Sequence, residues 1–266
     1  MMKTAIYTVV KDEVEYLNDF ILWHINMGID KIFIFEDLDS TSHKEICDKY
    51  PNVILQPVLS LFDSEEKPLV IKMKEEGKYR QTMYCKRGIM YIKNNYPDID
   101  WCFSLDCDEF VSSPVPFKSI LERYNDLDGV LLRWHNFGAS GRVFKPTYDK
   151  PIWEIYTQRC DYLKSDERSK HYTKVCYNMK RLKEGLIWGC HSIPSKNTVI
   201  VDDMWLNHYF TKSLEEWCDK LYKRGMFCKY RKIDDWFELN PDLLPMKEEL
   251  LKLKEEWLSQ PYQSFS

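Results

Sequence analysis

Long apolar runs and an excess of positive charge are both absent from this sequence. No apolar segment approaches the roughly 18 residues that a bilayer-spanning helix needs, so we expect any membrane contact to be peripheral. The 38 basic residues are outnumbered by 42 acidic ones, which gives a formal net charge of −4. This balance provides no electrostatic reason to expect a nucleic-acid partner. A small ligand is the better expectation.

Paired cysteines and glycine-rich loops are also missing. The nine cysteines include no C-x-x-C pair and their number is odd, so we interpret them as reduced thiols of a cytoplasmic protein. The first apolar segment, TAIYTVV, is too short for a signal peptide and is interpreted as a strand. Val9, Val10, Lys11 and Asp12 then stand where a phosphate-binding loop would need glycines. This absence disfavours a nucleotidyltransferase of that type.

Helical and extended segments alternate in the first half of the chain. Strands are predicted at residues 4–10, 31–35, 53–58 and 101–105, with helices between them that end at Gly28 and before Pro97. Hydrophobic residues make up 44% of the chain, which is enough for a sizeable core. The alternation predicts an α/β fold with one mostly parallel sheet flanked by helices. No linker or repeat interrupts it, so we expect a single domain over 1–266 with an elaborated C-terminal half.

Two helix starts and one surface helix are predicted from local patterns. Asp12-x-x-Glu15 and Ser213-x-x-Glu216 both resemble capping boxes, in which the first and fourth residues satisfy free backbone amides. A last helix at about 246–258 alternates charged and apolar residues. We expect it to dock on the domain surface, and a membrane or partner anchor is the weaker alternative.

The run WCFSLDCDEF at residues 101–110 is the most informative segment. Five uncharged residues, as in a buried strand, lead directly into Asp106, Asp108 and Glu109. Carboxylates at i and i+2 of an extended segment lie on the same side, so Asp106 and Asp108 can converge on one cation. Hard oxygen ligands of this kind suit Mg²⁺ or Mn²⁺, which take their remaining ligands from water and phosphate. A solvated acidic turn is the simpler alternative.

A second acidic residue is expected near this pair. Asp37 follows the predicted strand at 31–35, and ligands of parallel sheets bind beyond the carboxyl ends of the strands. His191 and His208, each in a strand-like segment, are candidates for a third metal ligand, with His208 slightly ahead of His191. A purely structural role is an equal alternative for either histidine. Lysines that could neutralise phosphates are Lys86, Lys174 and Lys212, although surface solvation is the better explanation for any single one of them.

An aromatic and small-residue block is a candidate sugar platform. Trp134 and Phe137 precede Gly138-Ala139-Ser140-Gly141, and sugar faces stack on aromatic rings where small residues let the backbone approach. An aromatic core followed by a turn explains the block equally well.

Five blocks of the sequence form an ordered series over roughly residues 4–225. They are KDEVEYLNDFILWHINMGIDKIFIFED, LDCDEF, WHNFGASGR, CHSIP and NHYFTKSLEEWCDKLYKRG. This series resembles glycosyltransferase family 92 and related family-2-like transferases of the GT-A fold. Asp12 stands where the family pattern has Asn. An Asp-x-Asp pair alone is weak evidence, whereas five blocks in order are strong.

The resemblance implies transfer of a hexose, galactose or glucose above all, from a UDP-sugar to a glycan or lipid-linked saccharide, with inversion. Residues 1–128 would be the nucleotide-sugar-binding half, 129–225 the acceptor side and 226–266 a helical extension. Mn²⁺ or Mg²⁺ would be held by Asp106, Asp108 and His208, or His191 in its place. The implied donor-binding residues are Val9, Lys11, Glu13, Asp37, Lys86, Asp106 and Lys212. The implied acceptor-binding residues are Trp134, Phe137 and Ser140.

No catalytic base can be assigned from the sequence. Inversion needs a carboxylate facing the acceptor hydroxyl, and the candidates are Glu154, Asp161, Asp166 and Glu167. Retention therefore stays open, and a catalytically inactive glycan-binding or scaffold protein is the alternative function. The expected location is the cytoplasm, with the inner face of a membrane as the place of peripheral contact.

Overall fold

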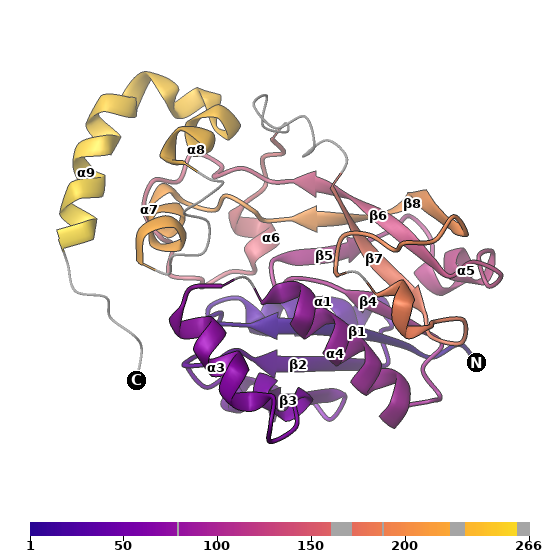
Figure 1. Cartoon of the computed structure of the whole chain (residues 1–266). Helices are drawn as coiled ribbons and strands as arrows, with labels where there is room; N and C mark the ends of the chain where they lie inside the picture. The colour runs from indigo at the N-terminus through magenta and orange to yellow at the C-terminus, as the bar shows by residue number, and fades with distance from the viewer. Residues whose placement is uncertain (79, 161–171, 188, 224–231, 260–266) are drawn as a thin grey trace. The chain divides into compact units, whose positions relative to one another are not determined.

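The chain forms one eight-stranded sheet flanked by helices (Figure 1). The computed structural model describes residues 1–78, 80–160, 172–187, 189–223 and 232–259. In spatial order the strands are β3 (Val53–Pro57), β2 (Lys31–Glu36), β1 (Thr4–Val10), β4 (Trp101–Ser104), β7 (Thr173–Asn178), β6 (Gly129–Asn136), β8 (Thr198–His208) and β5 (Glu109–Ser112). The four predicted strands of the N-terminal half are thus all present.

Pairing direction divides the sheet. β1 is parallel to both β2 and β4, and β2 is parallel to β3, whereas β7 is antiparallel to β4 and to β6. The predicted fold class, an α/β fold with one sheet flanked by helices, is confirmed. Because β2, β1 and β4 run in one direction, their carboxyl ends lie at one edge of the sheet, and this edge is called the rim below.

The helices are α1 (Leu17–Met27), α2 (Lys44–Cys47), α3 (Lys67–Glu75), α4 (Gln81–Asn95), α5 (Phe117–Glu122), α6 (Ile152–Ile155), α7 (Leu214–Cys218), α8 (Ile233–Leu239) and α9 (Lys247–Ser259). Helical segments of the 3-10 or π type are η1 (Val58–Leu61), η3 (Glu184–Leu186), η4 (Asp219–Lys223) and η5 (Pro241–Met246). None of the helices in the described part of the chain is long and apolar enough to cross a membrane.

The chain divides into two compact units. The first comprises Met1–Trp134 and Tyr172–Leu206, and the second comprises His135–His171 and Asn207–Ser266. Each unit has its own hydrophobic core. The predicted halves at about residues 1–128 and 129–225 do not follow this division and stay a prediction.

Helix α4 lies flush against β1 because of one glycine. A Cβ atom built on Gly88 would lie only 1.9 Å from a ring carbon of Tyr7, so no larger residue fits without a shift. Tyr7 is itself buried in the core of the first unit. This close approach sets where the first turn of α4 lies at the rim.

Helix α1 begins later than its sequence pattern predicts. It starts at Leu17, and Tyr16 precedes it without any side-chain cap, so the capping box expected at Asp12 and Glu15 is wrong. Asp12 instead adopts a left-handed φ of 56° and accepts the amide hydrogen of Thr41 at 2.8 Å. Its carboxylate therefore ties the loop after β1 to the loop after β2. The predicted end of α1 at Gly28 is confirmed, with a φ of 97°.

A buried histidine attaches α1 to β5. His24 donates from Nδ1 to the Phe20 carbonyl at 2.8 Å, and its Nε2 accepts the Val111 amide hydrogen at 3.2 Å. Burial lowers the pKa of His24 to about 3, so the ring is neutral. Its role is structural.

The second unit is organised around a buried carboxylate. The capping box predicted at Ser213 and Glu216 is confirmed at the start of α7. The phenols of Tyr148 and Tyr156 both donate to Glu216, the second at 2.6 Å. Burial raises the pKa of Glu216, but the nearby Lys212 ammonium and these donors outweigh it and leave the pKa below its usual range.

The last helix docks as predicted. Helix α9 spans Lys247–Ser259, against an expected 246–258, and buries Leu250 and Trp257 in the core of the second unit. Its remaining residues are mostly charged.

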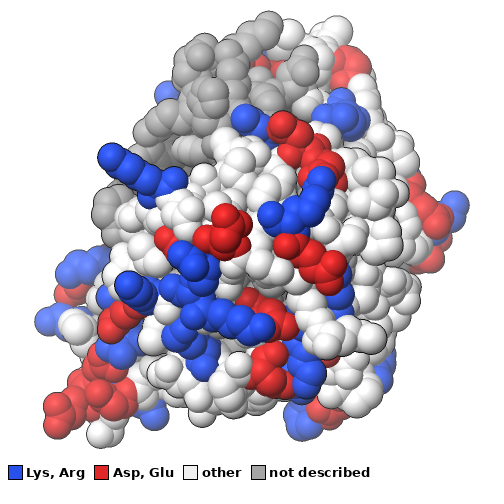
Figure 2. Space-filling model, turned by 90° about the vertical axis from the view of Figure 1, so that its right-hand side faces the viewer, with Lys and Arg blue, Asp and Glu red and all other residues white. Residues whose placement is uncertain are grey.

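On the face of the molecule shown in Figure 2, basic and acidic side chains lie next to one another.

Candidate functional site

The acidic segment after β4 closes into a turn. The Glu109 amide donates to the Asp106 carbonyl at 3.1 Å, and the Asp106 amide donates to Glu109 Oε2 at 2.9 Å. Asp106 and Asp108 therefore do not lie in an extended segment, which corrects the geometry predicted for this pair. The physical reason is the reciprocal pair of hydrogen bonds, which bends the chain between β4 and β5. Both Asp106 and Asp108 are partly exposed at the rim.

The Asp106 carboxylate is held from two sides. Lys174 on β7 donates from Nζ to Oδ2 at 2.7 Å, and Gln81 on α4 donates from Nε2 to Oδ1 at 3.1 Å. Burial raises the pKa of Asp106, but the Lys174 ammonium outweighs it and leaves the pKa below its usual range. Asp106 is thus an ionised, oriented acceptor.

Glu109 is the buried end of the same turn. Its side chain is fully buried, and its Oε2 lies 3.5 Å from Lys174 Nζ. Burial raises the pKa of Glu109 well above its usual range, although the Lys174 ammonium acts in the opposite direction. Glu109 supports the turn from within the core, and the partly exposed carboxylates of the turn are Asp106 and Asp108.

Asp37 lies at the rim beside β1, as predicted. Its amide donates to the Val10 carbonyl at 2.9 Å, directly after β2 ends. Its Oδ1 accepts the hydroxyl of Tyr84 at 3.1 Å, and its Oδ2 lies 3.5 Å from Arg80 Nη2. Two ionisable donors therefore fix the direction of this carboxylate. Since β1 separates β2 from β4, Asp37 and Asp106 flank the carboxyl end of β1.

The first turn of α4 connects the two carboxylates. Arg80 and Tyr84 contact Asp37, whereas Gln81, between them in sequence, contacts Asp106. These three residues were missed in the sequence analysis because neither an acidic pattern nor a metal-ligand spacing marks them. The available signal was the segment RQTMY at residues 80–84, which precedes the helix expected to end before Pro97.

The loop after β1 is anchored to the loop after β2 by a buried histidine. The Glu13 amide donates to His43 Nε2 at 3.1 Å, and His43 Nδ1 lies 3.1 Å from Glu36 Oε1. Val9 lies near the end of β1, and the partly buried Lys11 comes directly after this strand. The structure thus brings Val9, Lys11 and Glu13 to the rim, where their predicted donor-binding roles stay predictions.

The other two predicted donor-binding lysines, Lys86 and Lys212, are each held by contacts of their own. Lys86 is on α4, half exposed, and pairs with Glu184 at 3.2 Å. Lys212 belongs to the second unit, where it is buried with a left-handed φ of 52° and its carbonyl accepts the Trp236 indole hydrogen at 3.2 Å. Contact of either lysine with a phosphate stays a prediction.

The three predicted acceptor-binding residues fall in different units. Trp134, in the first unit, is buried and meets the Tyr172 and His191 rings edge to face at 5.5 and 5.6 Å. Phe137, in the second, stacks on Tyr209 at 5.0 Å, and Ser140 Oγ accepts the amide hydrogens of residues 157 and 158. These contacts show how the side chains are held, and their roles toward a sugar stay predictions.

Of the four candidate bases, one is described. Glu154 is exposed on α6. Asp161, Asp166 and Glu167 lie outside the described residues, so the base stays unassigned.

The side chains at the rim show which kind of metal ion they could hold. In the part of the chain that the structure describes, no group of three or more His, Cys, Asp or Glu side chains could hold a metal ion. Asp106 and Asp108 alone suit an ion that completes its shell with water and phosphate oxygens, which is how Mg²⁺ is commonly bound. The pair therefore fits a metal that accompanies a diphosphate, and it does not fit a metal held by the protein alone.

The two candidate histidine ligands have fixed ring orientations. His208 ends β8 with Nδ1 at 3.0 Å from Asn136 Oδ1. His191 lies in a loop after η3, not in the predicted strand, and donates from Nδ1 to the Thr173 carbonyl at 3.0 Å. Such an outer hydrogen bond is typical of metal-ligating imidazoles but is also common in structural ones. A third ligand from either residue stays a prediction.

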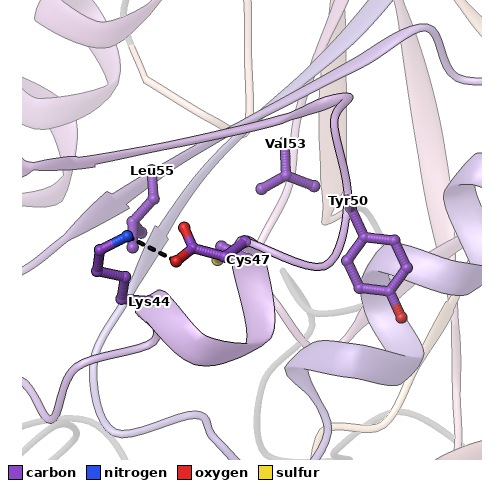
Figure 3. A pocket seen from close by; sticks show the side chains of 6 residues that line it. Lys44, Cys47, Tyr50, Val53 and Leu55 are labelled. Atoms are coloured by element: carbon purple, nitrogen blue, oxygen red, sulfur yellow. Dashed lines mark hydrogen bonds and ion pairs between the residues drawn. The ribbon is translucent and has the colours of Figure 1, made fainter.

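A surface hollow lies away from the rim. It measures about 330 Å³ and is lined by residues of α2, β3 and the turn between them, with Lys44 paired to Asp48 at 2.6 Å (Figure 3). None of the carboxylates described above lines this hollow. It adds no group to the site.

Comparison with known proteins leaves the family open. No protein-family model and no curated protein matches the chain. Among solved structures, A197 from STIV is similar with a TM-score of 0.38 and 10% identity, covering 79% of this chain and 86% of that one. The 4-diphosphocytidyl-2C-methyl-D-erythritol synthase from Anaerococcus prevotii is similar with a TM-score of 0.33 and 11% identity, covering 67% and 72%. These distant similarities carry no functional argument, and membership of family 92 stays a prediction.

Proposed function

We propose that this protein is a metal-dependent glycosyltransferase that moves a hexose from a UDP-sugar to a glycan or lipid-linked saccharide acceptor. The observation that carries the proposal is the placement of Asp37 and Asp106 at the carboxyl ends of β2 and β4, on either side of β1. A parallel sheet binds its ligand at this edge. The two carboxylates are oriented by the same turn of α4.

The two ends of the rim suit different parts of a nucleoside diphosphate. Asp37, an acceptor held by Tyr84 and Arg80, suits the N–H and O–H donors of a uridine. Asp106 and Asp108 suit a divalent ion on the diphosphate. When bound, that ion would stabilise the negative charge that develops on the departing diphosphate. Lys11, next to Asp12 at the end of β1, lies between these two ends of the rim and is the candidate for an additional phosphate contact.

Turnover with a panel of nucleotide sugars tests the proposal. Purified protein with Mn²⁺ should release UDP from at least one UDP-sugar, through transfer or slow hydrolysis, and Asp108→Ala should abolish this release. Asp98→Ala is the matched control, because Asp98 is an exposed aspartate that precedes β4 at the opposite edge of the sheet. No binding and no turnover of any nucleotide sugar would sink the proposal.

The alternative function has a distinct signature. A glycan-binding or scaffold protein that keeps the fold would bind a saccharide without releasing UDP from any donor. The unassigned base is the observation that keeps this alternative in view. Saccharide binding together with no UDP release from any donor, to an acceptor or to water, would favour it.

A further inference from the structure

A buried lysine sits directly behind the predicted metal ligand. Lys174 is fully buried on β7, and its ammonium contacts Asp106 Oδ2 at 2.7 Å and lies 3.5 Å from Glu109 Oε2. The side chain has no exposed surface, so burial and these two contacts hold the ammonium in place. A fixed positive charge is therefore part of the rim.

The same contacts limit how Asp106 can bind an ion. Lys174 occupies one lone pair of Oδ2, and Gln81 occupies one lone pair of Oδ1 at 3.1 Å. A carboxylate oxygen has two acceptor positions, so each Asp106 oxygen keeps one. An ion that binds Asp106 can therefore use only these remaining positions while Lys174 and Gln81 stay in place.

The positive charge of Lys174 also disfavours binding of a divalent cation to Asp106. A divalent ion on Asp106 would lie within a few ångströms of the Lys174 ammonium, and like charges at that distance repel strongly in a partly buried site. A diphosphate brings negative charge to the same place and offsets this repulsion. Among the described residues, no group of three His, Cys, Asp or Glu side chains could hold a metal ion, which also favours weak binding of the ion without a diphosphate.

We propose that Lys174 is a positioning residue that makes divalent-metal binding depend on the nucleoside diphosphate. The protein without UDP binds the ion weakly, whereas the ion and the diphosphate together bind the protein tightly. The inference rests on the proposed function, since it takes the rim as the diphosphate site. Coupling between two ligands is reciprocal, so the metal must strengthen UDP binding by the same factor.

Calorimetric titration of Mn²⁺ into the whole protein, with and without UDP, tests the inference. UDP should tighten Mn²⁺ binding by at least about fivefold in the wild type. Lys174→Met, which keeps the stem and removes the charge, should tighten Mn²⁺ binding without UDP and reduce the coupling. Lys174→Arg should behave as the wild type does. Lys180→Met is the matched control, because Lys180 is an exposed lysine paired with Asp100, and it should change neither value.

Two results would overturn the inference. One is unchanged or weaker Mn²⁺ binding by folded Lys174→Met in the absence of UDP. The other is equally tight Mn²⁺ binding by the wild type with UDP, with uridine and with neither, and this comparison decides the matter even where Lys174→Met fails to fold. If UDP binds with metal but Lys174 has no effect on the coupling, only this inference fails. If UDP binds under no condition, the proposed function fails as well.

Discussion

The hydroxyl of Tyr84 donates to Asp37 across 3.1 Å and accepts from Arg80 Nε across 2.9 Å. Burial, with the Asp37 carboxylate as a further cause, raises the pKa of Tyr84 to about 12, so the phenol stays protonated and able to donate. One side chain of α4 thus orients both a carboxylate and a guanidinium at the end of β2. The proposed uridine site depends on this arrangement.

Tyr84→Phe tests that arrangement with the ring packing kept. Loss of the hydroxyl removes one hydrogen bond to Asp37, so we expect UDP affinity to fall by about 2- to 10-fold, in line with about 0.5–1.5 kcal/mol for one such bond. Calorimetric titration of UDP in the presence of Mn²⁺ measures the effect. Tyr50→Phe is the control, because Tyr50 donates to Asn18 at 2.7 Å away from the rim. Equal losses in both variants would contradict the assigned role.

Gly88→Ala tests the close packing of α4 on β1. Alanine favours a helix interior over glycine, yet here its Cβ would lie 1.9 Å from the Tyr7 ring, so we expect a loss of about 1–3 kcal/mol in the free energy of unfolding. Urea unfolding measures it. Gly185→Ala, whose Cβ would meet no atom within 4 Å, should cost far less. A neutral Gly88→Ala would show that α4 can shift freely, and the rim geometry would then lose its anchor.

His24 predicts a pH dependence of stability. Its pKa is about 3 in the folded protein against an ordinary 6.5, so the unfolded chain takes up a proton first as pH falls. Stability is then lost between about pH 6.5 and pH 3, at up to about 1.4 kcal/mol per pH unit, and is fully present above pH 6.5. Urea unfolding at several pH values from 7.5 to 5 measures the slope.

The control for His24 is His24→Gln. This variant is expected to be less stable at pH 7.5, because it loses packing against Phe110, but its stability should vary less between pH 7.5 and pH 5. Identical slopes for the two proteins would contradict a neutral, buried His24.

Ser213→Ala tests the capping box of α7. The Ser213 hydroxyl accepts the Glu216 amide hydrogen at 3.3 Å and donates to Glu216 Oε2 at 2.7 Å. Its removal should lower the free energy of unfolding by about 0.5–2 kcal/mol. Ser259→Ala, at the exposed end of α9, is the control and should be close to neutral. Equal effects in thermal unfolding would argue against a specific cap.

The sequence carries much of the fold because the periodicities of its first half are strong. Residues 4–10, 31–35 and 101–105 are apolar runs bounded by charge or glycine, and all three are strands with close to the predicted bounds. The parallel order then places Asp37 and Asp106 at one edge without any further information.

The rest depends on contacts between residues far apart in sequence. Lys174 reaches Asp106 only because β7 pairs antiparallel with β4, and strand direction cannot be obtained from periodicity. The Asp12 carboxylate, predicted to cap a helix, instead accepts the amide hydrogen of Thr41, 29 residues away in sequence. His191 was predicted to lie in a strand-like segment. Its neighbours Cys190 and Ile193 instead belong to a loop and pack into the core of the first unit.

The most direct test of the account is a calorimetric titration of UDP into the protein with Mn²⁺ and, separately, with EDTA. We expect UDP to bind at least about tenfold more weakly with EDTA than with Mn²⁺. With Mn²⁺ present, UDP binding should be lost in Asp108→Ala and unchanged in Asp98→Ala. UDP binding that is equal with Mn²⁺ and with EDTA, or equal in the two aspartate variants, would contradict it.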